Sequence, residues 1–306
     1  MTLFENILIG DNAFIGVSHL SNARARQTLQ RLNVEKIVEV IRAASSNGAT
    51  GYSFTVHPTN SQILAKLDSS GVLAQDFSLY PILPYAAGYV RTMNEKGLLG
   101  TLGELLNQVS MVDRAKLLVR GAATSVAEDP IGLMKIYLDY EISRIPKRAK
   151  IGGVLLHEVI TDLALSYRAS NIVQSFIENI RNKWHATPGF VTRNFSRFVD
   201  FFEQMKLPFA DLIVMTPFNR IGFQMTPSKQ SCEASLSRVG NSKVIAMSIL
   251  AGGYLNLDEA AEYIRPLNLS GAVVGVSSVE HARQVFTKLR TIEGQRSKRT
   301  NLPQDD

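Results

Sequence analysis

The chain has 306 residues, of which 45% are hydrophobic and 20% charged, so it holds enough apolar residues for a full core and is not a disordered chain. Lys and Arg number 33 against 27 Asp and Glu, which gives a mild formal charge of +6. This excess suits a small anionic molecule as partner. Because the basic residues are scattered rather than clustered, no nucleic-acid partner is expected.

Cysteine content and hydropathy indicate the cellular compartment to expect. A single cysteine, Cys232, excludes a disulfide framework within the chain and has no evident base beside it to activate it. The opening residues MTLFENILIGDNAF lack a basic-then-apolar signal, and no apolar run reaches the ~20 residues that a membrane helix needs. We therefore expect a cytoplasmic protein without a membrane partner; the oligomeric state stays open.

Short β-branched, apolar runs recur along the chain and are typical of strands buried on both faces of a parallel sheet. In chain order they cover residues 6–12, 51–56, 79–85, 116–122, 151–159, 188–195, 211–219, 243–250 and 271–278. A (β/α)8 barrel has eight places for these nine candidates. One of the early candidates, in 1–12, 79–85 or 116–122, is therefore expected to be extra.

Segments of helical period lie between the strands, and their ends carry capping residues. The first, 33–48, begins at Asn33 as N-cap and ends at Gly48. Asp129 and Pro130 begin the next, and three more occupy 196–207, 257–267 and 278–290. The alternation predicts an α/β fold, a (β/α)8 TIM barrel in one domain over residues 1–293, followed by a flexible tail at 294–306.

In such barrels the active site lies at the C-terminal ends of the strands, so polar residues there are the candidates. Histidine can move a proton near neutral pH, and arginine forks match the oxygens of carboxylates and phosphates. The alternatives are a structural histidine and arginines in salt bridges to Asp11, Glu158 or loop carboxylates. The predicted catalytic residues are His157, His57, Glu158, Tyr85 and Asp11; the predicted substrate-binding residues are Arg120, Arg193, Asn194, Arg220, Asn219, Ser53 and Thr55.

Glycines and serines follow the last two candidate strands, each just before a helix. Such backbone can approach a phosphate or a dinucleotide pyrophosphate, although tight turns would look the same. The predicted cofactor-binding residues are Ser248, Gly252, Gly253, Gly275, Ser277, Ser278 and Arg283. A metal is not expected, because His19, His57, His157 and Asp11 match no metal-binding spacing. Since no lysine ends a strand, a Schiff-base mechanism is disfavoured.

The second half of the chain resembles the aldo/keto reductase superfamily in five segments that occur in the family's order. They are VLLHEVITD, VTRNFSRFVDFFEQM, DLIVMTPFN, VIAMSILAGGYL and VVGVSSVEHARQ, between residues 154 and 284. The resemblance implies the barrel fold, NADP or NAD as cofactor, and a catalytic tetrad of Asp, Tyr, Lys and His. Only the His has a match, at His157.

The segment GYSFTVHPTNSQIL departs from the family where the rest of the tetrad belongs. The family's Asp position falls on Ser53 and its Tyr position on Pro58, and no lysine ends the next strands. Its nicotinamide-facing positions hold Arg193 and Met215. A reductase would need Tyr85 or His57 as a new acid, because Pro58 has no proton to donate.

These observations are compatible with three alternative functions. The one slightly favoured is non-redox acid/base chemistry of lyase, dehydratase or isomerase type on an anionic substrate, with His157 helped by His57 or Glu158. The alternative is a divergent NAD(P)H-dependent oxidoreductase that reduces a carbonyl. The third is an inactive barrel that binds a ligand or partner.

Overall fold

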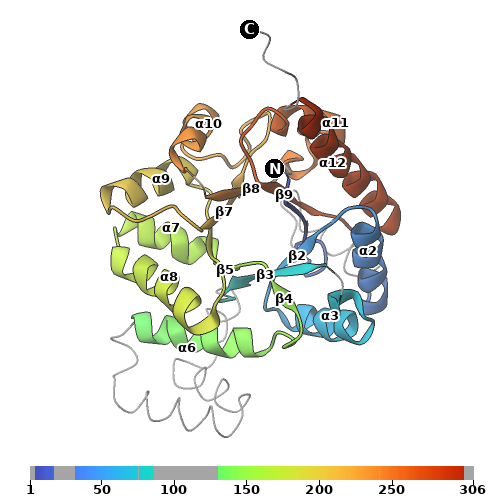
Figure 1. Cartoon of the computed structure of the whole chain (residues 1–306), viewed down its shortest axis with the longest axis horizontal. Coiled ribbons are helices and arrows are strands. Elements are labelled where there is room, and N and C mark those ends of the chain that lie inside the picture. Colours follow the sequence, from blue (N-terminus) through green and yellow to red (C-terminus); the bar gives the residue numbers. More distant parts are fainter. Residues whose placement is uncertain (1–3, 17–31, 75, 86–129, 241, 300–306) are drawn as a thin grey trace, which may run out of the picture.

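The computed structural model describes residues 4–16, 32–74, 76–85, 130–240 and 242–299, which form a closed parallel barrel ringed by helices (Figure 1). Around the barrel, each strand pairs with the next in parallel, and the pairing of β2 with β3 completes the ring. The strands are β1 (Asn6–Gly10), β2 (Gly51–Thr55), β3 (Ser78–Leu83), β4 (Lys150–Ile151), β5 (Val154–Leu156), β6 (Pro188–Val191), β7 (Ile213–Pro217), β8 (Lys243–Met247) and β9 (Gly271–Gly275). The predicted (β/α)8 barrel is confirmed.

β4 and β5 are two pieces of one barrel strand, because both pair in parallel with β3. Gly152 and Gly153 interrupt the strand, and a Cβ on Gly152 would overlap the Tyr80 ring. Eight of the nine predicted strands thereby fill the eight places. The ninth, residues 116–122, lies outside the described residues, and β3 pairs directly with β4 and β5 without it.

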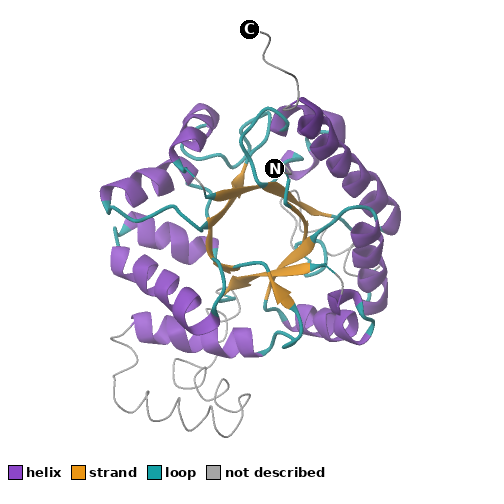
Figure 2. Ribbon diagram, in the orientation of Figure 1, coloured by secondary structure: helices purple, strands orange, loops and turns teal. Residues whose placement is uncertain are grey.

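The helices lie outside the strands, as the ring in Figure 2 shows. They are α2 (Val34–Ser46), α3 (Pro58–Ser69), α6 (Pro130–Ser143), α7 (Glu158–Ser166), α8 (Ser170–Trp184), α9 (Phe195–Gln204), α10 (Lys229–Ser235), α11 (Leu257–Ile264) and α12 (Val279–Arg299), with the short turns η1 (Val72–Ala74), η2 (Leu236–Arg238) and η3 (Ala251–Gly253). Within the described residues, none of these helices combines the length and the apolar character needed to cross a bilayer.

The predicted helix ends agree with the structure for α2. Asn33 is the N-cap, and its side chain accepts a hydrogen bond from the Lys36 amide, while Gly48 follows the helix with φ +116°. Asp129 lies outside the described residues, and Pro130 is the first residue of α6. α12 continues to Arg299, so the helix reaches into the segment predicted to be a flexible tail.

The core has two parts separated by the strands. The interior cluster fills the barrel with Leu8, Tyr80, Leu155, Val191, Ile213, Met215 and Ile245. The larger outer cluster packs the strands against the helices, with phenylalanine rings such as Phe190, Phe198 and Phe202 in tilted and edge-on contact between β6 and α9. Strand side chains therefore alternate between axis and helices, which explains why the runs are apolar throughout.

Tyr80 closes the N-terminal end of the barrel. Its hydroxyl donates a short hydrogen bond to Asn6 Oδ1, and its ring occupies the space that Gly51 and Gly152 leave. Burial raises the pKa of Tyr80 to about 12, so the phenol stays neutral. The opposite, C-terminal end of the strands, called the mouth below, is the end that remains for a site.

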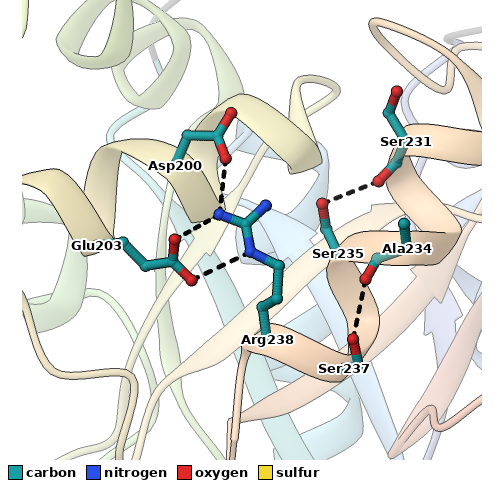
Figure 3. A network of polar contacts seen from close by, with 7 residues as sticks. All are labelled: Asp200, Glu203, Ser231, Ala234, Ser235, Ser237 and Arg238. Carbon is teal, nitrogen blue, oxygen red and sulfur yellow. Dashed lines mark hydrogen bonds and ion pairs between the residues drawn. The ribbon is translucent and has the colours of Figure 1, made fainter.

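An ion-pair network ties the outer layer together beside β7. Arg238, in η2, binds Asp200 and Glu203 of α9, while Ser235 and Ser237 bond to carbonyls of the preceding turn (Figure 3). This network lies on the helical surface and is partly exposed, so it connects neighbouring helices rather than forming a reactive site.

Candidate functional site

At the mouth, the end of β1 is level with the end of β9, and β2 extends two residues further. Gly10 is paired with Ser53 on one side and with Gly275 on the other. Because all strands are parallel, the residues after their C-terminal ends share this rim. The predicted strand-end residues that the structure describes are therefore grouped at one end of the barrel.

His157 lies at the mouth between β5 and α7, where it ends the strand and caps the helix. Leu155 belongs to the interior cluster and Leu156 to the outer one, so the alternation places His157 on the axis side. Its Nδ1 accepts a hydrogen bond from the Val159 amide at 3.2 Å. A nitrogen that accepts carries no proton, so in the neutral ring the proton is on Nε2.

Burial, two neighbouring charges and the α7 dipole act on the ionisation of His157. Burial lowers the pKa of the imidazole, and the Arg193 charge lowers it further, while Glu158 raises it. The positive end of the α7 dipole also disfavours an imidazolium at an N-cap. His157 is therefore a neutral ring that presents an N–H donor.

His57 repeats the arrangement between β2 and α3. Its Nδ1 accepts from the Thr59 amide at 3.1 Å, and Pro58 is the first residue of the helix. The His57 ring packs edge-on against Tyr85, with centroids 5.5 Å apart, and Tyr85 follows β3. The backbone amide of Tyr85 donates to both carboxylate oxygens of buried Glu141 on α6, at 2.9 and 3.2 Å. His57, Tyr85 and His157 thus follow three neighbouring barrel strands.

Arg193 and Glu158 form a two-pronged ion pair beside His157. Arg193 Nη2 lies 2.9 Å from Glu158 Oε1, and Nε lies 3.1 Å from Oε2. The sequence predicts Arg193 as an anion binder and Glu158 as a proton carrier. In the structure each already has the other as its partner, which is the salt-bridge alternative.

Arg220, another predicted anion binder, has an ion-pair partner of its own. Arg220 pairs with Glu262 of α11 at 3.0 Å, and both side chains are more than half exposed. Arg120 lies outside the described residues. Asn219 is buried and exchanges two hydrogen bonds with the backbone of Phe223, so it fixes the turn after β7.

Asp11 belongs to a buried polar network below the mouth. Its Oδ2 accepts from the Thr55 amide at 2.8 Å, the Thr55 hydroxyl at 3.0 Å and Asn60 Nδ2 at 2.7 Å. Asn60 also accepts from the Tyr52 hydroxyl. Burial raises the pKa of Asp11 despite these bonds, and Asp11 is 5% exposed. The carboxylate joins β1, β2 and α3 instead of facing the mouth.

Asn194 and the end of β6 are tied to α7. The Thr192 hydroxyl donates to Asp162 of α7, and Asn194 also bonds to that carboxylate. Burial raises the pKa of Asp162, while these hydrogen bonds oppose the rise. Asn194 therefore has a structural partner, although the sequence predicts it as a substrate ligand.

The floor of the mouth is apolar. Ser53 is 2% exposed and its hydroxyl lies 4.0 Å from the sulfur of Met215 across the barrel. Ile82 and Met247, both partly exposed, pack against the interior cluster there. Ser53 and Met215 stand at two positions where the resemblance implies polar residues, so this floor recognises little besides apolar atoms.

The predicted cofactor residues border the mouth at the ends of β8 and β9, which are neighbours. Ser248, Gly252 and Gly253 form a tight turn with positive φ, and the Ser248 hydroxyl lies 3.5 Å from Gln224 Oε1. On β9, a Cβ on Gly275 would meet nothing within 4 Å, and Ser277 is exposed. Ser278 caps α12 by accepting from the His281 amide, and Arg283 is exposed on that helix.

Two further predictions concern reactive groups. Cys232 is buried, and burial raises the pKa of its thiol, which makes it unreactive. Within the described part of the chain, His, Cys, Asp and Glu side chains nowhere gather in the threes that could hold a metal ion. His19 lies outside it.

Sequence reasoning missed Asn60, Glu141 and Asp162, polar partners at the mouth of which the first two are buried and the third is half-buried. Each lies on a helix rather than at a strand end, and each has a partner distant in sequence: Asp11 for Asn60, Tyr85 for Glu141 and Thr192 for Asp162. The available signal was a polar residue on the apolar side of a helix, which is weak without the fold.

No sequence-family profile and no curated protein sequence matches the chain. Two solved structures from Pseudomonas aeruginosa assigned as aldo-keto reductases cover 94% of this chain and 90% of theirs, with TM-scores of 0.54 and 0.53 and 11% and 10% identity. A structure assigned as a 2,5-diketo-D-gluconic acid reductase B covers 95% of this chain and 87% of its own, with a TM-score of 0.50 and 10% identity.

These likenesses show the fold of the chain. The chain is a (β/α)8 barrel similar in fold to these structures assigned as aldo-keto reductases, and it spans nearly their whole length. The predicted resemblance is confirmed for the fold and rests on structure alone. Activity does not follow from fold, so it has to be argued from the site.

Proposed function

We propose that the chain is a divergent NAD(P)H-dependent oxidoreductase that reduces a carbonyl compound at the mouth of the barrel. The observation that carries the proposal is the hydrogen bond from the Val159 amide to His157 Nδ1. It leaves His157 with an Nε2–H donor on the axis side of the mouth. A donor at that place can bind a carbonyl oxygen and stabilise the negative charge that develops there.

The same contacts weaken the acid/base alternative, which sequence analysis slightly favoured. A lyase or isomerase needs a base that takes a proton from its substrate. Glu158 is paired with Arg193, Asp11 is held in a buried network, and His157 Nδ1 is occupied. The structural neighbours, assigned as reductases, also favour an oxidoreductase over the lyase or isomerase prediction.

The residues that would hold the cofactor lie along the β8–β9 side of the mouth. The open space over Gly275, the exposed Ser277 and the N-terminus of α12 suit a pyrophosphate, which binds to backbone amides. Arg283 would lie near a second phosphate. When bound, the nicotinamide supplies a hydride to the carbonyl carbon.

The chain's own contribution is orientation and charge stabilisation. His157 would hold the carbonyl oxygen through Nε2–H, and the apolar floor around Met215 would exclude water from beneath it. A neutral imidazole is a weak acid, and Ser53 and Pro58 provide no tuned phenol. We therefore expect the proton that completes the alcohol to come from water at the half-buried His157, and turnover to be slow.

The proposal is tested first by binding. NADPH and NADH are titrated into the purified protein while nicotinamide fluorescence is recorded. We expect one of them to bind, and Gly275→Val to weaken binding at least about tenfold without loss of fold, because the new side chain fills the open space. No binding at millimolar cofactor would overturn the proposal.

Turnover is tested next, with a set of aldehydes and ketones. His157→Ala should lower kcat/KM by about 10²-fold or more while cofactor affinity is kept, since one oriented donor is lost. His185→Ala is the matched control, because His185 follows α8 and lies at the opposite end of the barrel. Equal activity of the two variants would show that His157 has no role in the reaction. The single-domain boundary at residue 293 and the cytoplasmic location stay predictions.

A further inference from the structure

The ion pair between Glu158 and Arg193 occupies the place where an anionic substrate would bind. The Arg193 fork offers Nε and Nη2 side by side, and both donate to the two oxygens of one carboxylate. A bidentate arrangement of this kind is how arginine holds a carboxylate or phosphate ligand. Here the chain itself provides that carboxylate.

The pair lies next to the reactive group of the proposed site. Glu158 directly follows His157, and both charges act on the His157 imidazole, in opposite directions. Val191 belongs to the interior cluster, so the alternation along β6 carries Arg193 back to the axis side of the mouth. The Arg193 side chain is 37% exposed and that of Glu158 is 27% exposed, so a ligand can reach both.

The pair is not needed to fasten α7 to the end of β6. Asp162 already joins the two elements, because it accepts from the Thr192 hydroxyl and bonds to Asn194 and to the Arg193 backbone. An ion pair about one-third exposed adds little to stability. The ion pair therefore matters more for which ligands enter the mouth than for the stability of the fold.

We propose that Glu158 is an internal counter-ion that neutralises Arg193 and selects neutral substrates. The inference rests on the proposed function and names its substrate class: uncharged carbonyl compounds, with an apolar body over the floor of Met215, Ile82 and Met247. A carboxylated or phosphorylated analogue has to displace Glu158 from Arg193 and leave the Glu158 charge beside its own, which disfavours it. Glu158 is thus a specificity-determining residue.

Three ring compounds of one shape and different charge test this selection without turnover or cofactor. Benzamide is neutral, benzoate is an anion and benzamidine is a cation. Their dissociation constants are measured by NMR titration of the full-length protein at low salt, where charge effects are least screened. The variants are Glu158→Gln and Arg193→Gln, each compared with the wild type, and circular dichroism confirms their folds.

In the wild type, benzamide should bind more tightly than either ion. Glu158→Gln leaves the Arg193 charge without its partner, so benzoate affinity should rise about tenfold while benzamide affinity is unchanged. Arg193→Gln leaves the opposite charge, so benzamidine should gain by a similar factor. If one variant does not fold, the other still gives the answer, because each changes preference in its own direction.

The matched control is Glu262→Gln, which removes the partner of Arg220 at the rim. It changes the net charge by the same amount and should leave all three affinities unchanged. Equal gains for benzoate in both glutamate variants would overturn the inference, as would unchanged preferences in both mouth variants or no binding of any ring. NADPH binding is measured separately, so failure here is distinguishable from failure of the oxidoreductase proposal.

Discussion

Asp11 provides the sharpest test of which polar groups at the mouth are structural. Asp11→Ala removes the carboxylate that accepts from the Thr55 amide and hydroxyl, and one of the two acceptors of Asn60 Nδ2. A buried donor left without a partner costs about 1–3 kcal/mol, and a lost hydrogen bond about 1 kcal/mol. We therefore expect Asp11→Ala to lower the free energy of unfolding by about 3 kcal/mol.

Asp11→Asn should cost less, about 1 kcal/mol, because an amide oxygen can still accept from Thr55 but carries no charge. The free energy of unfolding is measured by urea denaturation followed by circular dichroism. The control is Asp76→Ala, which removes an exposed partner of Lys150 and should give no measurable change. If Asp11→Ala unfolds at the wild-type urea concentration, the network does not stabilise the mouth, and Asp11 would again be a candidate for the chemistry.

Two other predictions concern the ends of the barrel. Gly152→Ala should destabilise the fold by about 2 kcal/mol in urea denaturation, because the added Cβ overlaps the Tyr80 ring, whereas Gly275→Ala, in open space, should change nothing. Folding lowers the pKa of His157, so as the pH falls through ~6.5 the His157 ring takes up a proton in the unfolded chain before it does so in the folded chain. The free energy of unfolding of the wild type, relative to that of His157→Gln, should therefore decrease from pH 8 to pH 5. A constant difference across that range would show that the ring is not buried as a neutral cap.

The barrel was predictable because its strands are buried on both faces and its helices begin and end at capping residues. The residues at which the strands end were less predictable. Residues 151–159 read as one strand, but the structure stops it at Leu156, because the His157 ring turns back to cap α7. The two glycines at 152 and 153 are explained only by Tyr80 and Ile213, which approach from other strands. A pattern along one strand cannot show what faces it across the barrel.

The positions of the site residues were predictable from the sequence, but the pairs that their side chains form were not. Arg193 and Glu158 are separated by 35 residues in sequence, and each alone is typical of a substrate contact or a proton carrier. Arg193 and Glu158 can pair because β5 and β6 are neighbours in the barrel. The same holds for Asp11, whose partners Thr55 and Asn60 become its neighbours only when β1 pairs with β2.

In the segment 51–64, Ser53 and Pro58 each have a structural role. Pro58 suits the first position of α3, where no backbone donor is needed, and His57 before it caps the helix. Ser53 packs against Met215, so a carboxylate at this position would be buried in an apolar floor without a partner. His57 and His157 use the same nitrogen for the same backbone bond. At His157, where burial also lowers the pKa, this leaves a neutral ring with an Nε2–H donor, which supports the proposed reaction, with negative charge developing on an oxygen, over one that begins by removing a proton.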